Sequence, residues 1–260
     1  MKLGEKPGEL VYSVVIPLFN ESSNIEVLYT RLKRTLKELK LPYEIIFVDD
    51  GSTDESYQIL RKIASTDSSV QVVKFIRNFG QHFAVTAGIL EARGQYIITL
   101  DADLQNPPEE IPKLVKKIKE GYDMISGYRK RRSDSVLRKV PSWGVNILIW
   151  VKTGVKMKDY GSMLRIFTRE TALRVASEFQ KTTGYISMLI PKVTRNVAEV
   201  EVRHNSRYSG ESRYNFRKLA LFVWKILLYP PKGGKRKTPP TSLFIIERKI
   251  VDGEEKIIAG

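Results

Sequence analysis

Two patterns of hydrophobic and polar residues alternate through the first half of the chain. Short runs of apolar and β-branched residues predict buried strands at 12–17, 43–48, 70–76 and 96–100. Between these runs, apolar residues recur at helical spacing, as they do from Ile25 to Leu39. Strands that alternate with helices in this way predict an α/β fold, in which helices cover both faces of a mostly parallel sheet.

Polar residues mark where the predicted helices begin. Ser23 with Glu26, and Ser52 with Glu55, have the spacing of a capping box, which predicts helix starts beside them. Pro107, which follows the fourth predicted strand, also favours the first turn of a helix, because amide groups there need no partner within the helix. We therefore expect a helix after each of the first, second and fourth strands. A short helix at about 82–92, with Gly94 after its end, is expected to follow the third strand.

The second half of the chain is less regular. Its pattern predicts three further strands, at 123–126, 161–167 and 197–202. It also predicts one amphipathic helix, at 135–152. Residues 245–260 are predicted to form a β-hairpin, because Asp252 and Gly253 favour its two-residue turn. We assign residues 1–229 to one main domain, and residues 230–260 to a linker followed by that hairpin.

The charge of the chain narrows the classes of partner. Its 260 residues include 44 Lys and Arg against 29 Asp and Glu, which gives a formal net charge of +15. This balance favours anionic partners such as nucleotides, nucleic acids or an acidic membrane surface. The chain has no cysteine, which excludes disulfides and thiolate metal sites. No apolar run is long enough for a transmembrane helix, so we expect the chain not to span a membrane.

Polar residues follow the predicted strands at the ends where α/β sheets bind ligands. Glu21 comes after the first strand, Asp49 and Asp50 after the second, and residues 101–105 after the fourth. The segment around Asp50 allows two interpretations that can both hold. In one, Ser52 caps the next helix. In the other, one of the aspartates binds a nucleobase or a ribose.

The segment Asp101-Ala102-Asp103 has the geometry of a divalent-cation site. In an extended chain, residues two apart point the same way, so both carboxylates can face one cation. Mg²⁺ and Mn²⁺ prefer oxygen ligands and share them with substrate phosphates, and Gln105 offers a further amide oxygen. The alternative interpretation is a solvated turn, but the apolar strand directly before Asp101 favours the cation site.

Four segments together resemble the family 2 glycosyltransferases of GT-A fold. They are VVIPLFNESSNIEVL, EIIFVDDGSTDES, RNFGQHFAVTAGILEARGQYIITLDADLQNPPEEI and YSGESRY. Within that family the chain is most similar to the polyprenyl-phosphate glycosyltransferases, a group that includes dolichol-phosphate mannose synthase and undecaprenyl-phosphate 4-deoxy-4-formamido-L-arabinose transferases. The resemblance covers about residues 10–225 and implies a GT-A fold with a central, mostly parallel sheet.

The resemblance implies roles for residues in both halves of the main domain. Residues 10–128 would be the nucleotide-sugar-binding half, and residues 129–229 the acceptor-binding half with amphipathic helices. The nucleotide pocket would be formed by Pro17, Phe19, Glu21, Asp50, Asp101 and Ala102. Mg²⁺ or Mn²⁺ would be held at the diphosphate by Asp101, Asp103 and Gln105. Catalytic roles would fall to Asp103, Arg129, Asp159, Arg207 and Arg213.

The implied reaction explains why arginines accompany these carboxylates. A lipid phosphate that attacks a sugar is already anionic near neutral pH, so it needs cations to hold it more than it needs a general base. The run from Arg129 to Lys139 contains six basic residues and one acidic residue, and arginine binds phosphate in a planar fork. The alternative for this run is a solvated basic loop or a patch for lipid headgroups.

We therefore expect a metal-dependent, inverting transfer of a sugar from a nucleotide diphosphate-sugar, UDP more than GDP, to a polyprenyl phosphate. The expected partners are this donor, this acceptor, and either a membrane surface or a separate membrane subunit, with no nucleic acid; a homo-oligomer stays open. The expected location is the cytoplasmic face of the membrane, peripherally bound. In many relatives a segment like NFRKLALFVWKILL leads into transmembrane helices, but here it leads into YPPKGGKRKTPPTS.

Three other interpretations stay open. A family 2 transferase with a non-lipid sugar acceptor would use Asp159 as its general base. A nucleotidyltransferase would need a Gly- and Lys-rich first loop, and PLFNESSN contains neither residue type. A basic module that binds nucleic acid or membrane without catalysis would show salt-sensitive binding that is indifferent to Asp101 and Asp103.

Overall fold

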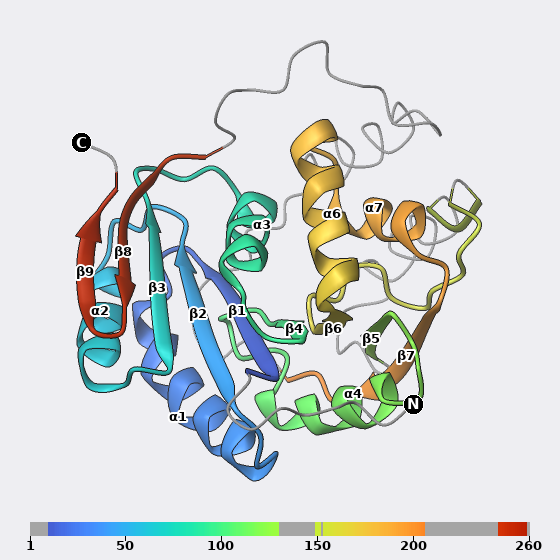
Figure 1. Ribbon diagram of the computed structural model, residues 1–260, viewed down its shortest axis with the longest axis horizontal. Coiled ribbons are helices and arrows are strands. Elements are labelled where there is room, and N and C mark those ends of the chain that lie inside the picture. The colour runs from blue at the N-terminus through green and yellow to red at the C-terminus, as the bar shows by residue number, and fades with distance from the viewer. Residues whose placement is uncertain (1–9, 130–148, 152, 206–243, 259–260) are drawn as a thin grey trace.

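The computed structural model describes residues 10–129, 149–151, 153–205 and 244–258 (Figure 1). Within these residues the strands form one nine-stranded sheet, in the order β7-β5-β6-β4-β1-β2-β3-β8-β9. The predicted α/β fold is confirmed, because helices lie on both faces of this sheet. None of the helices within the described residues has the length and apolar character that a membrane span requires.

The four central strands are the ones that the apolar runs predicted. They are β1 (Tyr12–Leu18), β2 (Tyr43–Asp49), β3 (Val70–Phe75) and β4 (Tyr96–Thr99). They run parallel to one another, with β1 between β2 and β4. Their carboxyl ends therefore lie at one edge of the sheet. Strands β2 and β3 lie on one side of β1 and β4 lies on the other, so the strand order reverses at β1, and α/β folds bind ligands at such a point.

Three strands from the second half extend the sheet beyond β4. They are β5 (Met124–Arg129), β6 (Arg165–Thr168) and β7 (Val197–Val202). Strand β6 is inserted between β4 and β5 and is antiparallel to both, whereas β7 is parallel to β5. The predicted strand at 161–167 is thus present, but it begins at Arg165.

The predicted hairpin is present and joins the opposite edge of the sheet. Strands β8 (Ile246–Val251) and β9 (Glu254–Ile257) are antiparallel and connected through Asp252 and Gly253. These two residues have φ angles of 52° and 78°, the left-handed values that a two-residue hairpin turn needs. Strand β8 pairs antiparallel with β3, so the hairpin is part of the central sheet. The predicted linker before residue 244 lies outside the described residues.

Six α-helices within the described residues form two layers. On one face of the sheet lie α1 (Ser22–Glu38), α2 (Ser56–Thr66) and α4 (Ile111–Ile118). On the other face lie α3 (Gln81–Glu91), α6 (Arg169–Thr182) and α7 (Ile186–Val193). The short 3-10 helix η1 (Pro108–Glu110) leads into α4, as the proline at 107 predicted. Most of the helix predicted at 135–152 lies outside the described residues.

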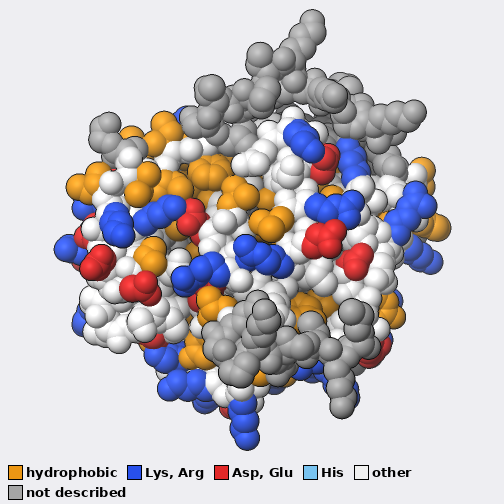
Figure 2. Space-filling view, in the orientation of Figure 1, with side chains coloured by type: hydrophobic (Ala, Val, Ile, Leu, Met, Phe, Trp, Pro, Cys, Tyr) orange, Lys and Arg blue, Asp and Glu red, His pale blue; other side chains and the backbone are white. Residues whose placement is uncertain are grey.

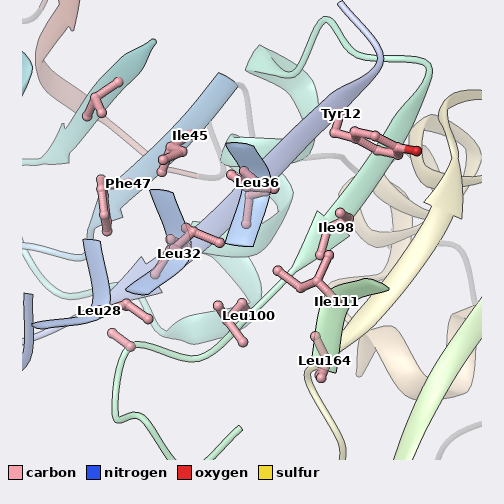
Figure 3. Close-up of a cluster of buried hydrophobic side chains, with 14 of the residues drawn as sticks. Tyr12, Leu28, Leu32, Leu36, Ile45, Phe47, Ile98, Leu100, Ile111 and Leu164 are labelled. Carbon is pink, nitrogen blue, oxygen red and sulfur yellow. The ribbon is translucent and has the colours of Figure 1, made fainter. Parts of the chain in front are cut away.

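The alternation of side chains in the strands explains this two-layer core. Val14 contributes to the cluster beneath α1, whereas its neighbour Val15 contributes to the cluster beneath α3. In Figure 3, Leu28, Leu32 and Leu36 of α1 point toward the strands of the sheet, and all three are fully buried. Because the central strands are covered on both faces, their sequences are almost continuously apolar.

Two helices begin at positions other than those the capping spacing predicted. Helix α1 begins one residue before Ser23, and no side-chain cap hydrogen bond forms at its start. Helix α2 begins at Ser56, so Ser52 caps nothing. The Ser52 hydroxyl instead accepts a hydrogen bond from the Asn20 N–H (2.9 Å), and the Ser52 N–H donates to Asp49 Oδ1 (2.8 Å). These polar residues therefore tie together the loops that follow β1 and β2.

The net positive charge is spread over the face visible in Figure 2. Lys and Arg side chains there are interspersed with acidic and hydrophobic side chains, and they do not form one continuous patch. Many of the basic residues are paired with carboxylates, for example Arg31 with Glu109 (2.8 Å) and Lys249 with Glu91 (2.6 Å). Ion pairs at the surface, such as these partly exposed ones, contribute little to stability. Composition alone therefore does not locate the functional site.

Helix α3 carries a histidine, His82, that is enclosed by aromatic residues. The His82 ring meets the Tyr185 ring edge-on, with 5.4 Å between centroids, and lies 6.4 Å from the Phe179 ring. Its Nδ1 is buried and has no hydrogen-bond partner among the described residues. Burial, and then the positive charge of Arg165, lower the pKa of His82 to about 4.

Acid should therefore destabilise the fold through His82. Between pH 6.5 and pH 4 the unfolded chain binds a proton at this residue and the folded chain does not, so His82 lowers the free energy of unfolding by up to about 3 kcal/mol as the pH falls. His82→Leu should remove that loss. Urea unfolding of both proteins at pH 7.5 and pH 4.5 measures the difference. A stability difference that does not change with pH would contradict this prediction.

Candidate functional site

A cavity of about 290 Å³ opens at the carboxyl edge of the four central strands. Its walls come from the ends of these strands and the loops that follow them. The lining residues are Pro17, Leu18, Phe19, Glu21, Asp50, Asn78, Gly80, Gln81, Asp101, Ala102 and Asp103. The cavity therefore lies at the edge where sheets of this topology bind ligands.

The cavity brings together most of the residues that the sequence nominated for nucleotide and metal binding. Pro17, Phe19, Glu21, Asp50, Asp101, Ala102 and Asp103 all line it. Gln105, Arg129 and Asp159 are not among the lining residues, and Arg207 and Arg213 lie outside the residues that the structure describes.

Asp50 holds the loop between β3 and α3 in place. Its Oδ1 accepts a hydrogen bond from the Phe79 N–H (2.7 Å), and its Oδ2 accepts one from the Gly80 N–H (2.9 Å). Burial raises the pKa of Asp50, and these two donors oppose that shift. Gly51 makes the close approach possible: its φ is +72°, and a Cβ there would lie 2.3 Å from the carbonyl carbon of Arg77.

The two carboxylates of the Asp101-Ala102-Asp103 segment repel each other across the cavity. Burial, and then the negative charge of Asp103, raise the pKa of Asp101 to about 7. Gln81 donates from Nε2 to Asp101 Oδ1 at 2.6 Å, which fixes the orientation of this carboxylate. Repulsion between two carboxylates that share a site is relieved when a cation binds between them.

These residues fit a divalent metal ion whose other ligands come from a substrate. No group of three or more His, Asp or Glu side chains in the described part of the chain could hold a metal ion. Mg²⁺ is commonly bound by one or two carboxylates together with substrate phosphates, and it does not need a cage made only of protein. Asp101 and Asp103 supply such a pair of hard oxygen ligands, in a cavity that also has room for phosphates.

A strained turn aims Asp103 at the cavity. Leu104 has a φ of 61°, which is rare for a bulky residue, and its side chain is buried in the core. The next residue, Gln105, donates from its backbone N–H to Asp103 Oδ1 (3.1 Å), and its carbonyl accepts from the Asn205 N–H (2.9 Å). Gln105 therefore closes this turn through its backbone, and the predicted role of its side-chain oxygen as a metal ligand stays a prediction.

Arg129 and Asp159, which the sequence treated as separate catalytic residues, are paired with each other. Arg129 Nε donates to Asp159 Oδ2 at 2.5 Å and Nη2 donates to Oδ1 at 2.9 Å, so the guanidinium forms a two-pronged fork. Both side chains are largely buried. Glu199 accepts the backbone N–H groups of Lys158 and Asp159 at 2.8 and 3.2 Å, which fixes the segment that carries Asp159.

Sequence reasoning missed a fully buried arginine between these two regions. Arg165 Nη2 donates to the Tyr160 carbonyl (2.7 Å) and to Ser187 Oγ (3.0 Å), and burial lowers the pKa of Arg165 to about 10. The charges of Asp159 and Asp101 oppose that shift. Arg165 is therefore a fixed positive charge that both carboxylates feel. The signal that could have revealed it is a single arginine placed directly before the apolar residues Ile166 and Phe167.

Besides Leu18 at the end of β1, the sequence did not indicate three lining residues of one loop: Asn78, Gly80 and Gln81. They belong to RNFGQ, the start of the third segment that resembles the family 2 glycosyltransferases. Nothing in their local pattern distinguishes them from an ordinary polar loop. Gly80 and Gln81 matter because they donate hydrogen bonds to Asp50 and Asp101 across the sheet edge.

The sheet order and the carboxylate pair at its edge define a GT-A type of α/β domain. Residues 13–197 match the glycosyl transferase family 2, and the chain belongs to this family. It is 42% identical over 216 residues to undecaprenyl-phosphate 4-deoxy-4-formamido-L-arabinose transferase from Shewanella sediminis. That alignment covers 83% of this chain and 65% of the relative, so the chain spans somewhat less than two thirds of the relative's length.

Solved structures of low sequence identity share the fold. Glucosyl-3-phosphoglycerate synthase from Mycobacterium tuberculosis, crystallised with Mn²⁺, uridine diphosphate and phosphoglyceric acid, has a TM-score of 0.62 and 18% identity. The match covers 98% of this chain and 95% of that one. The same synthase with Mg²⁺ and uridine diphosphate has a TM-score of 0.58 and 16% identity, and covers 84% of this chain and 77% of that one. The predicted GT-A fold is thereby confirmed.

Proposed function

We propose that this chain transfers a sugar from a nucleotide diphosphate-sugar to a polyprenyl phosphate, with inversion at the anomeric carbon, as a step of lipid-linked sugar biosynthesis. The observation that carries the proposal is the convergence of Asp50, Asp101 and Asp103 on one cavity at the carboxyl edge of the sheet. The acceptor is supported by the 42% identical relative, whose name specifies undecaprenyl phosphate.

The donor would lie in the cavity of about 290 Å³. Phe19 offers an aromatic surface and Glu21 a hydrogen-bond acceptor at its rim, suited to a base and a ribose. We propose that the donor carries a uridine nucleotide and not a guanosine nucleotide. This choice is supported by the uridine diphosphate that is bound in structures of the same fold.

Asp101 and Asp103 would hold Mg²⁺ or Mn²⁺ beside the diphosphate, with the side-chain oxygen of Gln105 as a further ligand. When bound, a divalent cation neutralises the negative charge that builds on the departing nucleoside diphosphate. The chain itself prepares the two ligands. Gln81 orients Asp101 through its 2.6 Å hydrogen bond, and the Gln105 N–H orients Asp103.

The acceptor phosphate would be held by arginines. Arg129 extends from the end of β5, and its two hydrogen bonds to the Asp159 carboxylate hold the guanidinium in one orientation. A guanidinium held in a fixed orientation suits the binding of a phosphate. Arg207 and Arg213 are further candidates for this task. Because a phosphate acceptor is anionic without the help of a base, Asp159 would orient Arg129 and would not need to remove a proton.

A lipid acceptor implies work at a membrane. We propose that the chain acts peripherally at the cytoplasmic face of the membrane or with a separate membrane subunit. The basic composition supports attraction to anionic lipid. Nucleic acid is not a proposed partner, since its phosphates would not use the carboxylate pair in the cavity.

A transfer assay tests the proposal. The purified chain is incubated with undecaprenyl phosphate, Mg²⁺ or Mn²⁺ and a panel of UDP- and GDP-sugars, and both nucleoside diphosphate release and lipid-linked sugar are measured. We expect a lipid-linked product from a UDP-sugar that disappears when the cation is chelated. Release of diphosphate without glycolipid would contradict the acceptor. Transfer to a soluble sugar but not to the lipid would favour the non-lipid alternative.

A further inference from the structure

Three aromatic rings connect the β8–β9 hairpin to the cavity. Phe244, just before β8, stacks on Phe75, the last residue of β3, with 5.0 Å between ring centroids and 19° between ring planes. Phe75 in turn meets Phe79 edge-on, with centroids 5.6 Å apart and planes at 86°. Phe75 is fully buried, so it contacts both rings inside the core that lies beneath α3.

The hairpin holds the end of β3 through the backbone as well. The Ile76 N–H donates to the Ile245 carbonyl at 3.2 Å, one residue beyond the end of β3. The register between β3 and β8 shifts between Lys74 and Phe75, which marks a bulge at this end of the pair. A bulge redirects the strand and the side chains beyond it. The hairpin therefore sets the direction in which the chain leaves β3 toward the cavity.

The loop that leaves β3 forms one wall of the cavity. Its Phe79 and Gly80 N–H groups donate to Asp50, and Gln81 donates to Asp101. The Arg77 guanidinium lies over the Phe79 ring, 4.3 Å from its centroid, on which Phe75 also packs. The Phe79 side chain is thus the anchor that keeps the loop against both carboxylates.

We propose that Phe244 is a positioning residue for the donor site, and that it acts through Phe75 and Phe79 on the loop 77–81. Removing its ring deprives Phe75 of its stacking partner, so Phe79 can tilt and its N–H can leave Asp50. Phe244 does not line the cavity, so its effect on ligand binding is indirect. The identity of the ligand rests on the proposed function, but the order of the loop does not.

The test compares two hairpin variants of the full chain. Phe244→Ala removes the stacked ring. Ile250→Ala removes a buried side chain of the same hairpin, opposite Val72 in the body of β3, and serves as the matched control for hairpin stability. Phe244→Tyr keeps the ring. Hydrogen exchange of the loop amides, melting temperature, and the dissociation constant for uridine diphosphate with Mn²⁺ are measured for each.

We expect Phe244→Ala to expose the Phe79 and Gly80 amides to exchange and to weaken uridine diphosphate binding roughly tenfold. Ile250→Ala should lower the melting temperature without either effect, and Phe244→Tyr should behave as wild type. Equal losses in both alanine variants, or protected loop amides in Phe244→Ala, would overturn the proposal. If the amides become exposed while even wild type fails to bind uridine diphosphate, the positioning role stands and the proposed donor is wrong.

Discussion

Asp103→Asn should reduce sugar transfer roughly a thousandfold while the protein stays folded. Asparagine has the same shape as aspartate but cannot supply a charged oxygen to a cation beside the diphosphate. It also removes the negative charge that, after burial, raises the pKa of Asp101 to about 7. The substitution therefore relieves a repulsion in the folded state, and the melting temperature should not fall.

Initial rates of lipid-linked product and of nucleoside diphosphate release, measured beside thermal unfolding, check this expectation. Asp101→Asn should behave in the same way. Glu109→Gln is the matched control, because it removes one carboxylate that is paired with Arg31 and does not line the cavity. A variant at Asp103 that kept a tenth of the wild-type rate would show that transfer does not depend on the carboxylate pair.

Arg129→Lys should lower the transfer rate to undecaprenyl phosphate by about a hundredfold. Lysine keeps the positive charge but cannot form the planar fork that Arg129 presents at 2.5 and 2.9 Å to Asp159. Lysine is preferred to alanine in this test, because alanine would remove both hydrogen bonds of the largely buried pair of Arg129 and Asp159, and breaking a buried ion pair costs about 3–5 kcal/mol of stability.

Asp159→Asn separates the two acceptor classes. If Asp159 only orients Arg129, Asp159→Asn should lower the transfer rate less than Arg129→Lys does. The loss should then appear mainly as a higher KM for the lipid acceptor. If Asp159 is instead the general base for a hydroxyl acceptor, the two variants should show the opposite order of rate losses. In that case Asp159→Asn abolishes turnover while Arg129→Lys remains active, and the lipid phosphate proposal fails.

The central strands could be predicted from the sequence, because their signal is local. Residues 12–18, 43–49 and 70–75 are covered on both faces, so each is a mostly apolar run with few polar residues. The carboxylates at the ends of these runs could be placed by the same logic, since parallel strands bring their carboxyl ends to one edge. The hairpin was equally readable, because Asp252 and Gly253 favour one turn type.

Features that depend on distant partners could not be predicted. No residue near Arg165 in the sequence indicates that β6 lies between β4 and β5. The fork between Arg129 and Asp159 joins residues that the chain separates widely, so each was assigned its own role. Capping spacing failed at Ser52, because its hydroxyl is engaged by the Asn20 N–H across the sheet edge. In each case a tertiary contact determined the local outcome.

The pairing of β3 with β8 also sets an order of events during synthesis. A ribosome releases Val70–Phe75 long before Ile246–Val251, so β3 waits without its outer neighbour while most of the chain is made. Contacts so remote in sequence close slowly, because a long loop must be ordered first. Until then β3 is an open edge that can pair with other nascent chains. The newly made protein is therefore exposed to aggregation through this strand until the hairpin docks.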